Sequence, residues 1–374
     1  MLIDARAIEA VIGAHLGRTF PAASLVVRIA GAETYARAFG FLDPESNQRP
    51  AQLDTRFDLA SVSKLFTVTA FMTLVEAGHF RLDQPVCEAL SEFEGLRPIR
   101  PYPDPLRAGQ VVSVSADDGE VDAAQVTFRH LLAHNSGLPA WLPLYRQGSR
   151  ERAYQEALHC AFSYPTGARV IYSDIGLILL GLAIERRLGQ RLDEVVAERV
   201  CAPLNLASVA YNPPDPRNIA PTEVCQWRQR RLIGEVHDEN AGGMDGVAGH
   251  AGLFGAARDV AALGEMYWRG GAPLLAERTV AEMTRLQSEW GGARRGLGFA
   301  LWSPDLDASS NPLSTRTFGH TGFTGTSLWV DPARELVVAC LTNRVYYGRD
   351  NADAMARFRV ILNQAIAGAV GGSL

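Results

Sequence analysis

The pattern of apolar and polar positions predicts a helix, a hairpin and a second helix at the start of the 374-residue chain. Apolar residues at helical spacing predict a helix over residues 7–16, and two strand-like runs at 23–29 and 34–41 predict a hairpin. Residues 62–75 are apolar almost all round and are followed by Gly78. This pattern is typical of a buried central helix with a glycine stop.

The middle of the chain is predicted to be mostly helical. Residues 95–119 are rich in Pro, Gly and Asp and have weak periodicity, so we expect a long surface loop there. Helical spacing returns in four segments, at residues 127–133, 150–160, 175–188 and 192–200. The most apolar stretch, residues 175–184, is far shorter than the roughly 20 residues of a membrane span, so it predicts a buried helix.

The last third of the chain predicts an antiparallel sheet enclosed by helices. A helix over residues 257–268 precedes three strand-like segments, at residues 298–302, 326–330 and 336–342, and a helix over residues 352–367 ends the chain. Strands near both chain ends with helices between them predict an α+β fold. We expect an α/β sheet subdomain, residues 1–60 and 245–374, and a mainly helical subdomain, residues 61–244.

Composition and charge narrow the classes of function. The chain is 47% hydrophobic and 21% charged, a balance that can bury a core and excludes global disorder. Its 36 basic and 41 acidic residues give a net charge of −5, so the chain lacks the net positive charge that attracts nucleic acid or an anionic membrane. The nearest basic cluster, residues 228–231, is short and is interpreted as solvated surface. We therefore expect no nucleic-acid partner and no membrane association.

The cysteine pattern gives no sign of a disulfide framework, and the N-terminal residues give no sign of a signal peptide. The five cysteines are odd in number, scattered and without a CxxC pair, so we expect buried thiols rather than disulfides or a metal cluster. The first residues form an amphipathic stretch that carries Glu9 and Arg18. No basic segment followed by an uninterrupted apolar stretch is visible there, so we expect a cytoplasmic protein.

The sharpest chemical feature is the segment Ser61-Val62-Ser63-Lys64 at the start of the predicted apolar helix. Positions three apart lie on one helix face, so Ser61 Oγ and Lys64 Nζ can meet. A serine hydroxyl needs a neighbouring base, and burial makes a lysine lose its proton more readily. The pair therefore predicts a nucleophile and its base. The alternative is a helix-capping Ser61 with a solvated Lys64.

Two further polar segments lie next to predicted buried elements. Tyr172-Ser173-Asp174 comes directly before the helix predicted at residue 175, and the segment GHTGFTG, residues 319–325, leads into a predicted strand. Taken singly, Asp174 is explained as a helix N-cap and Tyr172 as a half-buried aromatic residue. The glycine-flanked segment is explained as a flexible hairpin.

In this order, an SxxK helix, a YxN-like loop and a K/H-T-G strand resemble the family of penicillin-binding proteins, class C β-lactamases and D-alanyl carboxypeptidase-like serine hydrolases. The resemblance runs from about residue 20 to residue 365. It is also carried by FDLASVSK (57–64), FRHLLAHNSGLP (128–139), YSDIGLILLG (172–181) and GHAGLF (249–254). It implies an antiparallel sheet flanked by N- and C-terminal helices, with a mostly helical inserted subdomain.

The resemblance implies an acyl-enzyme mechanism. Ser61 is the expected nucleophile, Lys64 helps to deprotonate it, and Tyr172 acts as general base or proton shuttle. How the work divides between Tyr172 and Lys64 stays open. The backbone N–H groups of Ser61 and Phe323 are the expected oxyanion hole, which stabilises charge that develops in the transition state. The resemblance implies no metal and no cofactor.

The departures from the family pattern bear on the substrate. Asp174 stands where the YxN motif has Asn, which exchanges an amide for a carboxylate. His320-Thr321-Gly322 stands where efficient β-lactamases have KTG, so a fixed cation is replaced by a group of uncertain charge. We expect Asp174 and this triplet to contact substrate. The resemblance associates histidine there with D-alanyl peptidases and esterase-like members, so β-lactamase activity ranks lower.

A second histidine-rich block raises the question of a metal. His237, Asp238 and His250 lie in residues 234–252, but the spacing between the histidines does not match a metal-binding signature, so we expect no metal site. We expect His237 and Asn240 to make structural hydrogen bonds at the edge of the cleft and His250 to support the fold. Contact between this block and the substrate is the alternative.

Three aromatic residues remain without a role. Trp141 and Tyr145 follow a proline turn at the place where the family has a loop at the cleft mouth. They either shape a pocket for the acyl or leaving group, or pack onto the helical part of the chain. Trp227 lies in the basic stretch and gives no interpretation beyond packing at a surface or a lid.

The sequence therefore predicts a serine hydrolase that cleaves an ester or amide through an acyl-Ser61 intermediate, most simply as an esterase. One alternative is a D-alanyl peptidase, a penicillin-binding enzyme or a weak class C-type β-lactamase that uses the same residues. Another is a catalytically silent binding module on this fold, although binding alone does not require Ser61, Lys64 and Tyr172 together. The expected partner is a small ester, amide or β-lactam, and the oligomeric state stays open.

Overall fold

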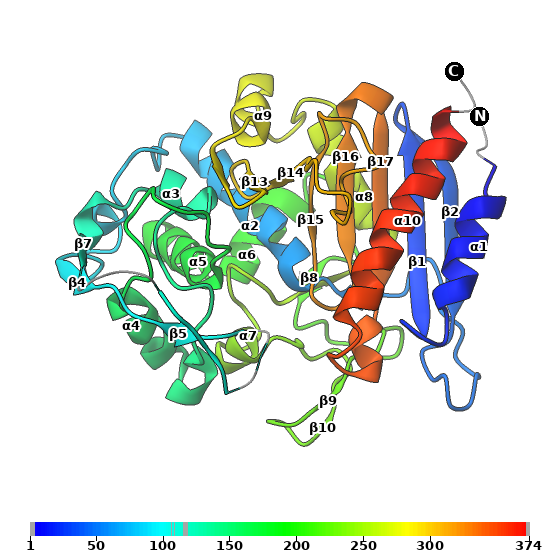
Figure 1. Cartoon of the computed structure of the whole chain (residues 1–374), viewed down its shortest axis with the longest axis horizontal. Helices are drawn as coiled ribbons and strands as arrows, with labels where there is room; N and C mark the ends of the chain where they lie inside the picture. Colours follow the sequence, from blue (N-terminus) through cyan, green and yellow to red (C-terminus); the bar gives the residue numbers. More distant parts are fainter. Residues whose placement is uncertain (1–3, 106, 108, 115–118, 372–374) are drawn as a thin grey trace.

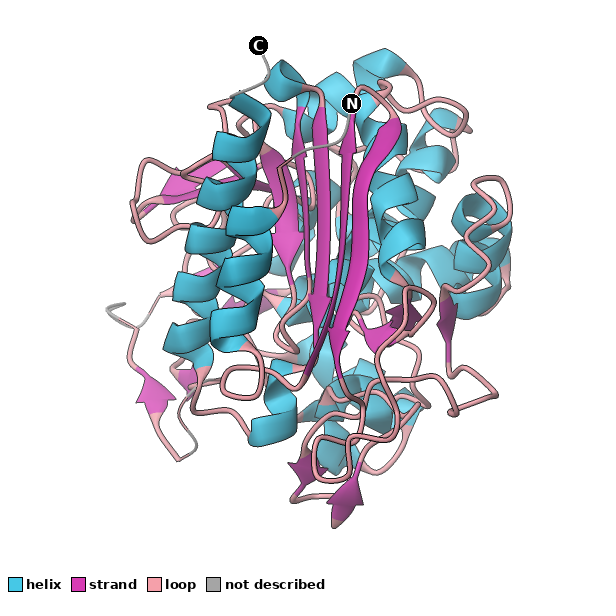
Figure 2. Cartoon of the chain, turned by 90° about the vertical axis from the view of Figure 1, so that its right-hand side faces the viewer, coloured by secondary structure: helices cyan, strands magenta, loops and turns pink. Residues whose placement is uncertain are grey.

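A computed structural model describes residues 4–105, 107, 109–114 and 119–371. The largest element is an eight-stranded antiparallel sheet in the order β12-β13-β14-β15-β16-β17-β1-β2. Its strands are β1 (Ala22–Ile29), β2 (Ala32–Gly40), β12 (Ser288–Trp290), β13 (Ala293–Arg295), β14 (Ala300–Leu301), β15 (Phe318–Thr321), β16 (Ser327–Asp331) and β17 (Leu336–Thr342). Strand β1 from the N-terminal part pairs with β17 from the C-terminal part, so the two ends of the chain share one sheet (Figures 1 and 2).

Two layers of helices cover this sheet, one on each face. Helices α1 (Arg6–His15) and α10 (Ala352–Gly371) pack together on one face, and α8 (Ala257–Trp268) packs against β1, β16 and β17 on the other (Figure 1). Strand β17 explains why both faces are covered, because its side chains alternate between two cores. The core under α1 and α10 contains Leu336, Val338 and Cys340, and the main core contains Val337, Ala339 and Leu341. Alternate side chains of one strand point to opposite faces, so an all-apolar strand needs cover on both.

The second half of the molecule is mostly helical and lies beside the β15 side of the sheet (Figure 1). Its longer helices are α2 (Ser63–Glu76), α4 (Arg150–His159) and α5 (Asp174–Leu188), and its shorter ones are α3 (Phe128–Leu132), α6 (Leu192–Val196), α7 (Glu239–Gly243) and α9 (Glu277–Thr284). Most of α2 and most of α5 are buried. Helices that are apolar all round form only where other elements enclose them.

Short strands complete the fold between these helices. They are β3 (Phe57–Asp58), β4 (Leu96–Pro98), β5 (Tyr102–Pro103), β6 (Val111–Val112), β7 (Glu120–Asp122), β8 (Ala210–Tyr211), β9 (Val224–Cys225), β10 (Arg230–Arg231) and β11 (Leu253–Gly255). Strand β11 pairs with both β3 and β8. This small sheet holds the segment before α2 against the segment after α7, and both segments contribute to the site described below.

The predicted α+β fold is confirmed, with differences in detail. The predicted loop over residues 95–119 contains the short strands β4, β5 and β6, and residues 106, 108 and 115–118 of it lie outside the described residues. The predicted helix over residues 192–200 is α6 followed by a π-helical turn at Ala197–Cys201. Strands β12, β13 and β15 could not be predicted from periodicity, because each strand has only three or four residues and is too short to show a clear period. The predicted boundary between two subdomains stays a prediction.

Two smaller expectations are also tested by the structure. All five cysteines are free thiols, and four of them are buried, whereas Cys87 is half-buried. Among the residues that the structure describes, none of the helices combines the length and the apolar character that crossing a membrane requires.

Candidate active site

The predicted nucleophile lies in a 3-10 turn, Ala60–Val62, that leads directly into α2. Lys64 Nζ lies 2.9 Å from Ser61 Oγ, and the Lys64 side chain is 1% exposed. Ala60 has a left-handed backbone with φ of +45°, a conformation that costs free energy in a residue other than glycine. The alternative with a solvated Lys64 is therefore wrong, since this side chain points into the protein beside the serine.

Lys64 is held in place by two further acceptors. Its Nζ lies 2.7 Å from Asp174 Oδ1 and donates to the backbone oxygen of His250 at 3.0 Å. Burial lowers the pKa of Lys64, but the charge of Asp174 and the interaction with Tyr172 outweigh burial and raise it above its usual value. The expectation that burial frees this lysine of its proton is corrected, because the carboxylate that replaces Asn in the YxN motif stabilises the ammonium.

Two cationic side chains lie near the ring of Tyr172. Lys64 Nζ is 4.9 Å from the centre of its ring, and the Arg295 guanidinium is 5.0 Å from it. The hydroxyl oxygen is buried. Burial raises the pKa of Tyr172, Lys64 opposes this shift, and Asp174 adds to it, so the net pKa is raised. The tyrosine is a neutral phenol at neutral pH, beside the lysine that it is expected to assist.

The start of α5 places Tyr172 and Asp174 in the site. Ser173 is the N-cap, because its Oγ accepts from Gly176 N and also donates to Pro139 O. Asp174 is the first helical residue, and its backbone N–H donates to Ala140 O. The interpretation of Asp174 as the N-cap is therefore wrong. Capping by the residue before it leaves the Asp174 carboxylate to pair with Lys64.

The HTG segment forms the end of β15 and the loop after it. His320 is buried, and burial together with the nearby charges of Lys64 and Arg295 holds its pKa well below the usual value, so the ring is neutral. Gly322 lies against the turn before Ser61, because a Cβ there would come within 2.6 Å of Leu59 O. The structure therefore brings the SxxK turn, the YxN-like loop and the HTG loop together, although they are far apart in sequence.

Asp58 joins three parts of the site and was not singled out by the sequence analysis. Its carboxylate accepts from Ala60 N at 2.8 Å and from His237 N at 2.6 Å, and its backbone oxygen accepts from Thr324 Oγ1. The side chain is 1% exposed. It therefore fixes the turn before Ser61. An aspartate three residues before the serine in FDLASVSK was the available signal, since a buried carboxylate must be hydrogen-bonded.

The second histidine-rich block lies behind Lys64. His250 Nε2 lies 2.8 Å from Asp238 Oδ1, and the donor atoms of Asp174, Asp238 and His250 lie within 4.8 Å of one another. This trio is a possible metal ligand set by residue type. However, the Lys64 ammonium pairs with Asp174 and supplies positive charge at the same place. The absence of a metal site stays a prediction.

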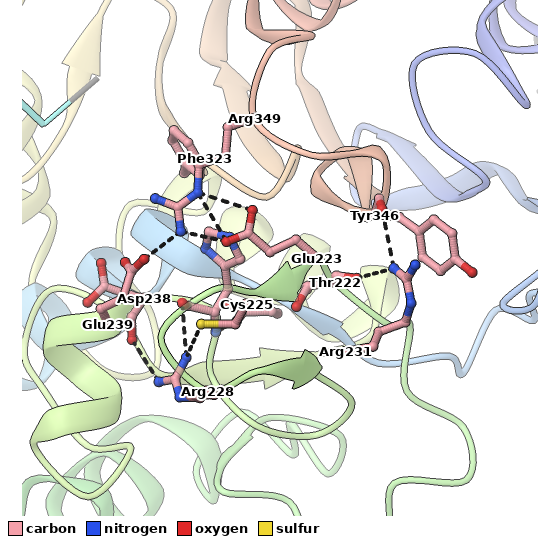
Figure 3. Close-up of polar contacts among 12 residues, drawn as sticks. Thr222, Glu223, Cys225, Arg228, Arg231, Asp238, Glu239, Phe323, Tyr346 and Arg349 are labelled. Carbon is pink, nitrogen blue, oxygen red and sulfur yellow. Dashed lines mark hydrogen bonds and ion pairs between the residues drawn. The ribbon is translucent and has the colours of Figure 1, made fainter. Parts of the chain in front are cut away.

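The ring of Phe323 is clamped by charged and aromatic side chains. His237 stacks on it with ring centres 5.6 Å apart, and the Arg344 guanidinium lies 4.5 Å from the ring centre. Arg344 Nε also donates to Phe323 O at 2.7 Å. Figure 3 shows Arg349 beside this ring, reaching Glu223 and Glu239. The backbone of Phe323 is therefore held from several sides.

Acid should weaken this clamp through Glu223. Burial raises the pKa of Glu223, but hydrogen bonds from His237 and Arg349 outweigh it and lower the pKa from 4.5 to about 2. A lowered pKa contributes stability that is present above pH 4.5 and is lost as pH falls toward 2. Because Arg349 is partly exposed, solvent screens its interaction with Glu223. We therefore expect this contribution to the unfolding free energy to be about 2 kcal/mol.

The check is chemical unfolding at pH 7 and pH 3. Wild type should lose more unfolding free energy between these values than Glu223→Gln, which cannot lose the ion pair by protonation. Glu156→Gln, at an exposed position on α4, is the control and should behave like wild type. Equal losses in all three proteins would contradict a role of Glu223 in acid stability.

An antiparallel sheet whose strand β15 lies beside a buried SxxK helix and a tyrosine loop defines a serine hydrolase of the β-lactamase and penicillin-binding-protein type. The chain belongs to the Beta-lactamase family, whose sequence pattern matches residues 8–361. The resemblance drawn from the sequence is thereby confirmed. The curated relatives described next also indicate that the protein is a hydrolase of this family.

Two curated relatives are similar over most of the chain. An N-acetylmuramyl-L-alanine amidase of Bacillus subtilis (strain 168) is 31% identical over 379 aligned residues, which cover 91% of this chain and 80% of the relative. A protein of Escherichia coli (strain K12) named as a D-alanyl-D-alanine carboxypeptidase is 30% identical, covering 79% of this chain and 70% of the relative.

Solved structures share the fold at lower identity. EstCE1, a hydrolase with promiscuous acyltransferase activity, has a TM-score of 0.75 at 23% identity, covering 97% of this chain and 98% of that one. The octameric penicillin-binding protein homologue from Pyrococcus abyssi has a TM-score of 0.71 at 22% identity, covering 96% and 78%. At these identities the likeness establishes the fold alone.

Proposed function

We propose that this protein cleaves an ester or amide bond of a small substrate through a covalent acyl-Ser61 intermediate. The observation that carries the proposal is the 2.9 Å contact between Ser61 Oγ and a Lys64 that is buried beside Tyr172 and Asp174. A binding site alone does not need a serine hydroxyl in contact with a buried amine, whereas nucleophilic catalysis does.

Acylation begins when Ser61 Oγ attacks the carbonyl carbon of the substrate. In the active form of the site one of Lys64 and Tyr172 has lost its own proton, so that this group takes the hydroxyl proton of Ser61 while the new C–O bond gives a tetrahedral oxyanion. This intermediate collapses with cleavage of the bond to the leaving oxygen or nitrogen, which takes a proton from the same network. Water then attacks the acyl-enzyme in the same way and releases the acid and free Ser61.

The oxyanion and the substrate would be bound by the elements around Ser61. The backbone N–H groups of Ser61 and Phe323 are the proposed oxyanion donors, and the contacts to the ring and the carbonyl oxygen of Phe323 support this role by holding the residue in place. Asp174, His320, Thr321 and Gly322 are the proposed substrate contacts. Asp58, through its bond to Ala60 N, is a positioning residue for the turn that carries Ser61.

An amide substrate of the N-acetylmuramyl-L-alanine type is the second, narrower candidate. It is supported by the similarity to the Bacillus subtilis amidase over 91% of this chain. Rapid β-lactam turnover is less favoured, because the neutral His320 supplies no fixed cation for the carboxylate of the drug. Short activated esters remain the simplest laboratory substrates, since they acylate serine hydrolases with little need for recognition.

Mass spectrometry of the intact protein tests the intermediate. After rapid mixing with a nitrophenyl acetate or with benzylpenicillin and an acid quench, we expect a mass increase equal to the acyl group, mapped to the peptide that contains Ser61. A persistent penicilloyl adduct would favour a penicillin-binding enzyme, and fast nitrocefin turnover would favour a β-lactamase. A protein that hydrolyses none of these substrates and shows no adduct would overturn the proposal in favour of a binding module.

A further inference from the structure

A partly buried arginine of the C-terminal helix is bonded to the loop that begins at the glycine of the HTG segment. Nη2 of Arg359, in α10, donates to the backbone oxygen of Gly322 at 2.7 Å and to the backbone oxygen of Thr326 at 2.9 Å. These two residues are the ends of the 322–326 loop, which carries Phe323. Helix α10 crosses the face of the sheet that it covers together with α1 (Figure 1), so the arginine links this helix to the loop.

Arg359 has no acidic partner to balance its charge. Among the described residues, its hydrogen-bond acceptors are these two carbonyl oxygens, and no carboxylate forms an ion pair with it. Burial and the nearby charge of Arg344 lower the pKa of Arg359 to about 10, so its guanidinium is still charged at neutral pH. A cation that is removed from water costs free energy unless it is well bonded. The two carbonyl oxygens of the loop therefore accept the hydrogen bonds of a cation that no carboxylate neutralises.

The Gly322 carbonyl belongs to the peptide bond whose N–H group is a proposed oxyanion donor. The cis peptide bond of the described residues is Ala272–Pro273, so the bond between Gly322 and Phe323 is trans. In a planar trans peptide the C=O and N–H groups point in opposite directions. The hydrogen bond that holds the Gly322 oxygen toward Arg359 therefore also fixes the direction of the Phe323 N–H, which points away from this arginine.

Ser61 and Arg359 approach the 322–326 loop from different sides. Val62, next to Ser61, belongs to the main core, whereas Phe358, next to Arg359, belongs to the core under α1 and α10. Within the described part of the chain, the Phe323 N–H donates to no protein acceptor. This N–H is therefore a backbone donor that is free to bind an oxyanion, and such a donor stabilises the transition state only when its direction is fixed beforehand.

The charge of Arg359 also makes the Phe323 N–H a stronger donor. A cation at the carbonyl oxygen draws electron density along the peptide bond, and hydrogen bonds that share one peptide polarise and strengthen one another. Arg344 has a different effect, because it binds the oxygen of Phe323 itself. That oxygen belongs to the next peptide bond, so Arg344 holds the loop without acting on this N–H.

We propose that Arg359 is a positioning residue for the oxyanion hole, because its bond to the Gly322 oxygen orients and polarises the peptide whose N–H, on Phe323, stabilises the oxyanion. The inference rests on the proposed acyl-enzyme function and adds to it a residue that does not touch the substrate. It gives the C-terminal helix a part in catalysis besides packing. The interaction strengthens as the oxyanion develops, so its loss should lower the rate of the chemical step.

Three substitutions in the full chain separate the charge of Arg359 from its packing. Arg359→Met keeps an apolar side chain and removes the charge. Arg359→Lys keeps the charge, and because the single nitrogen Nη2 makes both bonds in wild type, one ammonium with three N–H groups can replace it. Arg357→Met is the matched control, because it removes an exposed arginine from the same helix.

The measurement compares 4-nitrophenyl acetate with 4-nitrophenyl thionoacetate, in which sulfur replaces the carbonyl oxygen. Sulfur is a weaker hydrogen-bond acceptor, so an oxyanion hole favours the oxygen ester. Single turnovers with enzyme in excess, corrected for spontaneous hydrolysis, would give kcat/KM for both esters. We expect Arg359→Met to lower kcat/KM for the oxygen ester about ten-fold or more and for the sulfur ester much less, so that the oxygen-to-sulfur ratio falls. Arg359→Lys should recover a large part of the rate and of the ratio, and Arg357→Met should match wild type.

The ratio separates a role in the oxyanion hole from a merely structural role. Thermal unfolding of each protein would show how much of it is folded at the assay temperature. An Arg359→Met protein that keeps the wild-type ratio, whether or not its rate falls with its stability, would show that Arg359 only supports the fold. A ratio that falls equally in Arg357→Met would also contradict the inference. Failure of the proposed function looks different, because Ser61→Ala would then hydrolyse the oxygen ester as fast as wild type, and the role of Arg359 would fall with it.

Discussion

Ser61→Ala should abolish hydrolysis of a short nitrophenyl ester, lowering kcat by about 10⁴-fold or more, because the acyl intermediate of the proposed mechanism forms on the Ser61 hydroxyl. The side chain that is lost is small and lies in a short 3-10 turn, so the fold should persist. The measurement is the initial rate of ester hydrolysis together with a thermal unfolding curve for each protein.

Ser63→Ala is the matched control for this experiment. Ser63 lies two residues further on and is fully buried, and its Oγ accepts from Leu253 N at 3.2 Å. We expect the control to lose about 1 kcal/mol of stability and to keep most of its activity. If Ser61→Ala kept the rate of wild type, or if only Ser63→Ala lost activity, the assignment of the nucleophile would be wrong.

The second large effect concerns Lys64 and its carboxylate partner. Lys64→Met should lower kcat by about 100-fold or more, because the proton from Ser61 then loses its route into the network. It also leaves Asp174 beside the site without its ammonium, which lies 2.7 Å away in wild type. Enzyme kinetics at saturating ester, compared with the unfolding free energy, would separate lost catalysis from lost stability.

Asp174→Asn tests the electrostatic part of the same idea and restores the family's YxN pattern. The Asp174 charge raises the pKa of Lys64 and also that of Tyr172. Whichever of the two accepts the proton, activity should rise with pH as that group loses its own proton. Removing the carboxylate should therefore move the rising limb of the kcat/KM profile toward lower pH.

The profile would be recorded on the nitrophenyl ester from about pH 6 to about pH 11, because the wild-type limb is expected at alkaline pH, and spontaneous hydrolysis would be subtracted. Glu156→Gln on α4 is a suitable control, because it removes one negative charge at an exposed position. A limb that stays in place in Asp174→Asn, or that moves equally in the control, would show that the Lys64–Asp174 pair does not govern proton transfer.

Much of the fold could be predicted from the sequence because its helices and long strands carry strong patterns. The boundaries of α1, β1, α2, α8 and β17 agree with the predictions within one or two residues. The short strands, α9 and the exact cap of α5 could not be predicted, since pairing partners distant in sequence decide them. Ser173 and Asp174 are both good N-cap residues, and only the contact with Pro139 O shows which one caps the helix.

The sequence by itself determined the set of chemical groups, namely a serine and lysine on one helix face, a tyrosine at a helix start and a glycine-flanked HTG segment. Only the tertiary structure decided their protonation and their neighbours. Lys64 keeps its proton because the folded chain brings Asp174 to within 2.7 Å, and His320 loses charge because it is buried near two cations. Likewise, Tyr145 and Trp227 are distant in sequence and meet only in the fold. Charge and contact depend on distance in space, which local sequence patterns do not encode.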